Sequence, residues 1–136
     1  MATLQDAIAA IQTEALAMTG IMAAPAYMPG QAPAGPFVIT APATGSLGFQ
    51  DGWIQGEHVV ACHILMPRLD LGLAISVLIP YIEVFFKRLV ANKTLTGNVE
   101  WVSRVTYEWV YSFAYNGVEH CGPRFDISFS QEASST

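Results

Sequence analysis

Histidine and cysteine are the residues whose chemistry this chain could most readily use, and they fall in two short clusters. His58, Cys62 and His63 lie close together, and His120 and Cys121 are adjacent. Thiolate and imidazole groups are the usual ligands of zinc. In a strand, however, His58 and Cys62 would share one face while His63 lies on the other. No Cys-x-x-Cys or His-Glu-x-x-His pattern occurs in the sequence, so we expect no metal site and no cofactor.

A cysteine nucleophile is the alternative use of the same residues. It requires a histidine within hydrogen-bonding distance, and Cys62 with His120 across a sheet is the candidate pair. Neither cysteine has a sequence neighbourhood that would lower the pKa of its thiol. Gly45, Gly48 and Gly52 do not follow the spacing of a phosphate-binding loop. We therefore expect two buried thiols, no catalytic residues and a protein that is not an enzyme; a Cys-dependent hydrolase is the rival from the enzyme class.

The elements that would position these side chains begin with a helix and a loop. Thr3 and Asp6 have the spacing of a capping box, and the apolar residues that follow recur at helical spacing over about 15 residues, as far as Gly20. Residues 23–36 contain four prolines and two glycines. Because proline and glycine interrupt regular structure, this segment is predicted to be a loop.

A hairpin and a strongly apolar helix follow. Residues 37–41 and about 57–66 are rich in β-branched residues and predict two antiparallel strands, joined by a long glycine-containing loop at 42–52. Asp70 has the position of an N-cap, and the apolar run that begins after it predicts a helix over 71–90. The run is too short for a membrane span and is interrupted by proline and glutamate.

The last part of the chain alternates between apolar and polar residues. Val99–Tyr115 predicts a strand with one aromatic face, and Asn116-Gly117 is a strong hairpin signal. The apolar positions after the turn are out of phase by one residue, so we expect a bulge at Gly122-Pro123. The prediction is an α+β fold, with an antiparallel or mixed β-sheet packed against two helices in the order α-β-β-α-β-β-β. Residues 1–129 would form one domain and 130–136 a flexible polar tail.

The composition indicates a surface that is partly covered by other protein. Hydrophobic residues make up 52% of the 136 residues and charged residues only 12%, against about a quarter in typical soluble domains. The net charge is −5, and all six basic residues lie at or after Arg68. An acidic chain with no basic cluster argues against specific recognition of nucleic acid.

Two parts of the chain are candidate interaction sites. The 71–90 helix is apolar around nearly its whole circumference, and each large side chain left in water would forfeit roughly 1.5–3 kcal/mol, so we expect this helix at a subunit boundary. Asp51 and Glu57 flank the glycine-rich tip and are candidates for a channel or docking loop, although they could equally serve only to solvate it. The interface candidates on the helix are Leu73, Val77, Ile82, Phe85 and Phe86.

Three features together carry a family resemblance over about residues 3–129. They are residues 63–71 (HILMPRLDL), an internal Pro80-Tyr81 in the helix, and residues 89–99 (LVANKTLTGNV). In this arrangement the chain resembles the tail terminator or tail-completion proteins of long-tailed bacteriophages. The segment 23–52 is longer and richer in proline and glycine than that family suggests.

The resemblance implies a structural role in a virus particle. The chain would form a homohexameric ring that caps the tail tube and joins it to the head, with the tail tube protein and the head connector or head-closure protein as partners. It would reside in the tail or neck of the virion, after assembly in the host cytoplasm, and catalyse nothing. Another neck or tube subunit, such as a head-closure or tail-tube protein, would share these features, as would an oligomeric small-ligand-binding domain.

Overall fold

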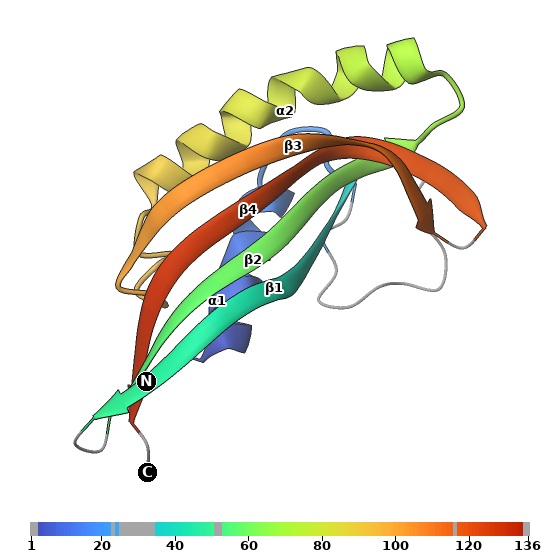
Figure 1. The fold of residues 1–136 in the computed structure, drawn as a ribbon. Helices are drawn as coiled ribbons and strands as arrows, with labels where there is room; N and C mark the ends of the chain where they lie inside the picture. Colours follow the sequence, from blue (N-terminus) through green and yellow to red (C-terminus); the bar gives the residue numbers. More distant parts are fainter. Residues whose placement is uncertain (1–2, 23, 25–34, 51–52, 116, 135–136) are drawn as a thin grey trace.

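Two helices and a four-stranded sheet make up the described part of the chain. The computed structural model describes residues 3–22, 24, 35–50, 53–115 and 117–134. The strands pair only antiparallel, in the order β1-β2-β4-β3, so the α+β class is confirmed (Figure 1). The elements in chain order are α1 (Leu4–Leu16), β1 (Phe37–Gln50), β2 (Trp53–Pro67), α2 (Leu71–Ala91), β3 (Trp101–Tyr115) and β4 (Val118–Ser134).

Both helices begin at the residues that the sequence predicts. Thr3 Oγ1 accepts a hydrogen bond from the Asp6 N–H at 3.2 Å, and Asp6 Oδ2 accepts one from the Thr3 N–H at 2.9 Å, which completes the capping box. Asp70 caps α2 by accepting from the Leu73 N–H at 3.1 Å. Each cap satisfies backbone donors that a helix start leaves without an intrahelical partner.

The main core lies between the helices and one face of the sheet. α1 packs over β1, and α2 packs over β2, β3 and β4, so both helices cover the same face (Figure 1). Phe85 of α2 meets Phe125 of β4 edge to face, with ring centroids 5.0 Å apart. A smaller cluster occupies the opposite face, where Phe37, Ile39, Leu65 and Tyr115 are buried together.

The first hairpin is longer than the sequence predicts. Residues 42–50 were expected in a loop, but β1 continues through them and pairs with β2 to the end, with one extra residue between Pro42 and Thr44. Proline is tolerated there because β1 is an edge strand whose outer N–H groups have no ladder partner. The 23–36 loop falls mostly outside the described residues; where it begins and ends, Met22 N–H donates to the Pro36 carbonyl at 2.8 Å.

The end of the chain is also more ordered than expected. Residues 130–134, predicted as part of a flexible tail, are strand, because β2 supplies their hydrogen-bond partners from Glu57 back to Trp53. We call residues 44–50, 53–59 and 128–134 together the arm. It extends beyond the beginning of β3, which pairs with Ser130 at Trp101 (Figure 1).

The second hairpin has the predicted pairing at its turn, but its bulge does not lie at the predicted position. Tyr115 pairs with Val118 as expected, whereas the extra residue lies in β3, between Val110 and Phe113, and not at Gly122-Pro123. Gly122 and Pro123 therefore lie within the single strand β4, and the fold ends with two strands in place of the three expected. Gly122 serves another purpose, because a Cβ there would collide with the Ile64 carbonyl oxygen. The backbone of β2 thus approaches β4 too closely for a side chain.

Candidate functional site

The two cysteines are free thiols in the interior. Cys62 lies in the main core, where the Thr40 hydroxyl donates to its Sγ at 3.6 Å. Burial raises the pKa of the Cys62 thiol to about 12, and burial also raises the pKa of Cys121. Both groups are protonated at neutral pH, whereas a cysteine nucleophile acts as the thiolate.

Each of the three histidines lies against an aromatic ring. His120 packs against the ring of Phe37 on the face opposite to Cys62, so the sheet does not form the pair that a cysteine hydrolase would need. The His63 ring lies tilted against Phe113, with centroids 4.9 Å apart, and burial lowers the pKa of His63, with the nearby Arg124 guanidinium adding to the effect. Among the described residues, no group of three or more His, Cys, Asp or Glu side chains could hold a metal ion.

The outer surface of α2 carries exposed apolar residues, but only part of the predicted interface set belongs to it. Leu73 and Phe86 are 56% and 47% exposed. Val77 and Ile82 are half-buried, with Ile82 packed on the main core. Phe85 is fully buried, so its assignment to the interface is wrong: its ring fills the space above Phe125.

Other exposed apolar residues on α2 and β3 were not among the predicted interface residues. On α2, Ile79 and Val90 share one side of the helix and Val84 lies on another, a distinction that the apolar circumference of the helix conceals. On β3, the alternation predicts an aromatic face but does not indicate which of its side chains are exposed. These exposed residues are Ile79, Val84, Val90, Tyr107 and Tyr111.

A groove lies where the end of α2 approaches the beginning of β3. It has a volume of about 320 Å³, and its apolar walls come from Phe86, Leu89 and Val90 on one side and Val102 and Val105 on the other. Lys93 and Arg104 also line it. We call this feature the α2–β3 groove.

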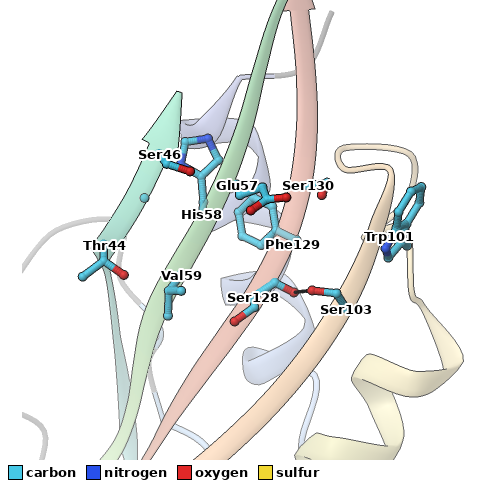
Figure 2. Close-up of a pocket in the computed structure, with 11 residues that line it drawn as sticks. Thr44, Ser46, Glu57, His58, Val59, Trp101, Ser103, Ser128, Phe129 and Ser130 are labelled. Atoms are coloured by element: carbon cyan, nitrogen blue, oxygen red, sulfur yellow. Dashed lines mark hydrogen bonds between the residues drawn. The ribbon is translucent and has the colours of Figure 1, made fainter. Parts of the chain in front are cut away.

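A second hollow, of about 480 Å³, lies on the arm (Figure 2). Cross-strand neighbours share a sheet face, so Ser46, Glu57 and Ser130 form one polar row across three strands. In the next row, Ser103 of β3 donates to the Ser128 carbonyl at 3.2 Å. Glu57, a predicted channel or docking residue, is exposed here, whereas Asp51 lies outside the described residues.

His58 explains two of the glycines around this hollow. Its ring lies beside Phe129, with centroids 5.7 Å apart. A Cβ at Gly45 would lie 2.9 Å from His58 Nδ1, and a Cβ at Gly56 would collide with Nε2. Gly45 and Gly56 therefore leave room for the His58 ring.

No family model and no curated protein matches the chain. Of the helices in the described residues, neither is long and apolar enough to cross a membrane. The site is therefore defined by its own surfaces: an apolar α2–β3 surface with a groove, and an arm with a polar hollow.

Proposed function

We propose that this protein is a virion structural subunit that assembles into a ring, caps the tail tube of a long-tailed phage and provides the joint to the head connector. The partners would be further copies of the chain, the tail tube protein and the head connector or head-closure protein. The protein would function without a cofactor, without specific nucleic-acid recognition and without a membrane.

The observation that carries the self-assembling part of this proposal is the exposed apolar surface of α2 and β3. Five large apolar side chains of one helix, Leu73, Ile79, Val84, Phe86 and Val90, are each 44% or more exposed. Three of them, Ile79, Phe86 and Val90, lie on one side of the helix at spacings of seven and four residues, and exposed apolar patches of this kind mark interaction surfaces. The low fraction of charged residues supports the same conclusion.

The phage-specific part rests on the sequence resemblance together with the agreement of the fold order. The helix, hairpin, helix and second hairpin follow in the expected order, with N-caps at the expected residues. Another neck or tube subunit would fit the same observations. The arm hollow, with its carboxylate and row of hydroxyls, favours the oligomeric ligand-binding domain as the second candidate.

Two measurements test the proposal. Particle mass in solution, with negative-stain microscopy, should give a closed ring of identical subunits, six under the resemblance. Antibody labelling of purified particles should then place the chain at the junction of head and tail. A protein that stays monomeric at micromolar concentration would contradict ring assembly, and retention of a stoichiometric small molecule in native mass spectrometry would favour the ligand-binding alternative.

A further inference from the structure

The outer edge of the arm is an exposed strand without a single charge. β1 is an edge strand, and the stretch 41–48 is exposed throughout, including Leu47 at 67%. None of the fourteen residues of β1 is Asp, Glu, Lys or Arg. Edge strands normally carry charges or are covered, because their free N–H and C=O groups pair readily with another strand. Pro42 and the adjacent bulge protect only the base of this edge.

The charges of the described residues are distributed unevenly between the arm and the groove. Three of the six basic side chains form ion pairs: Arg68 with Glu119, Arg88 with Glu14 and Arg124 with Asp126. The remaining three, Lys87, Lys93 and Arg104, make no ion pair within the described part of the chain, and two of them, Lys93 and Arg104, line the α2–β3 groove.

The arm offers the opposite charge. Glu57 is exposed on it and makes no ion pair among the described residues. Its cross-strand neighbour in β1 is Ser46, which shares its face of the sheet, whereas Leu47 pairs with Gly56 and lies on the other face. The arm therefore presents a carboxylate next to an uncharged strand edge, while the groove combines apolar walls with two cationic groups.

We propose that the arm of one copy docks against the α2–β3 groove of the next copy, with the face that carries Glu57 turned towards Lys93 and Arg104. The inference deepens the proposed function and rests on it, since it supplies the contact between neighbouring subunits. The arm belongs to the β1 edge of the sheet and the groove to the β3 edge (Figure 1). Such a contact is head-to-tail, so every copy uses one arm and one groove. A chain of copies linked in this way closes into a ring when the rotation between neighbours divides a full turn, and otherwise grows as a filament.

Charge reversal on each side provides the test. Glu57→Lys should weaken self-association at least about tenfold, because like charges then face each other, and Lys93→Glu with Arg104→Glu should do the same. Mixing the two variants should restore assembly, since each arm again meets a groove of opposite charge. The triple variant in one chain should assemble alone. Raising the salt concentration should weaken the wild-type contact.

A matched control is Glu119→Lys, which makes the same charge change in another exposed glutamate, about ten residues further along the sheet or ~30 Å away. It should assemble like the wild type, because an exposed ion pair contributes little. Circular dichroism checks that each variant is folded. If Glu57→Lys fails to fold, Ser46→Lys takes its place, because Ser46 is exposed beside Glu57 on the same face, and the same groove variants serve as partners.

The outcomes separate the inference from the proposed function. A wild-type ring that persists unchanged in Glu57→Lys, or folded variants that stay monomeric when mixed, would overturn the arm-and-groove contact and leave the ring intact as a proposal. A wild-type protein that does not self-associate would overturn both. Loss in each single variant with recovery on mixing supports the contact, because an interface that joins like surfaces would gain nothing from mixing.

Discussion

Two adjacent phenylalanines of α2 allow stability and assembly to be perturbed separately. Phe85 is fully buried and lies edge to face on Phe125. Its replacement by alanine removes a large side chain from a packed core and leaves a cavity, which costs about 3–5 kcal/mol of the free energy of unfolding. Phe85→Ala should therefore bring the monomer close to its limit of stability, since small domains are stable by only about 5–15 kcal/mol.

Phe86 should show the reverse pattern. It is 47% exposed in the isolated chain, so folding buries only about half of its side chain. Replacing it by alanine should therefore lower the free energy of unfolding by only ~1 kcal/mol. A phenylalanine side chain has an accessible area of about 200 Å², so the exposed part of Phe86 amounts to ~90 Å². At ~25 cal/mol per Å², covering it in an interface contributes at most about 2 kcal/mol, or about 30-fold in the association constant. Phe86→Ala should thus weaken assembly by up to about twice the free energy that it removes from the fold.

Urea denaturation and analytical ultracentrifugation measure the two quantities on the same samples. The denaturation series has to be run under conditions where the wild type and both variants are monomeric, because association would add to apparent stability. The reasoning is refuted if Phe85→Ala loses less than ~1 kcal/mol, or if Phe86→Ala self-associates as tightly as the wild type. The first result would mean that the core is not packed around Phe85, and the second that the α2 surface is not an interface.

Three further outcomes are expected. The pKa of His63 is lowered in the folded protein, so the unfolded chain takes up a proton on this histidine at a higher pH than the folded chain does. The free energy of unfolding should therefore fall as the pH drops below ~6.5. Urea denaturation at a series of pH values should show a smaller fall for His63→Phe than for the wild type. Cys62 should resist iodoacetamide in the native state and be labelled only on unfolding, as followed by mass spectrometry, because its thiol is buried and protonated. Gly122→Ala should prevent folding through the collision with the Ile64 carbonyl, whereas Gly48→Ala, with open space around it, should leave the circular dichroism spectrum unchanged.

The parts of the fold that could be predicted are those whose signals are complete within a few residues. A capping box needs only Thr3 and Asp6, and an N-cap needs only Asp70 and the N–H three residues on. The pairing of Tyr115 with Val118 follows from the turn between them. Each of these interactions is local, so no knowledge of the rest of the chain is required.

The arm could not be predicted in this way, because its partners are far apart in sequence. Residues 42–50 have loop-like composition, yet β2 pairs with them, and β4 pairs with β2 from about 70 residues further along the chain. Strand propensity depends on such neighbours more than on the residue itself. The same holds for Phe85 and Phe86: a helix that is apolar around its circumference does not indicate which of two adjacent rings faces the core, and the packing on Phe125 decides it.

Glu57 connects the sequence interpretation with the surface that the fold builds. If the acids of the arm rim a channel, symmetry would make them a negative collar that repels DNA phosphates, and rings of a Glu57→Lys variant would form normally but alter DNA passage. If Glu57 instead lies against Lys93 and Arg104 of the next copy, its charge is neutralised within the contact and cannot contribute to a collar. The two roles exclude each other, and they differ in when the substitution acts. If Glu57 is a docking residue, its substitution weakens the association of subunits before any particle forms, and this association depends on salt. If Glu57 is a collar residue, its substitution leaves assembly intact and changes only the later passage of DNA. Under the arm-and-groove contact, a negative collar would have to come from an acid other than Glu57.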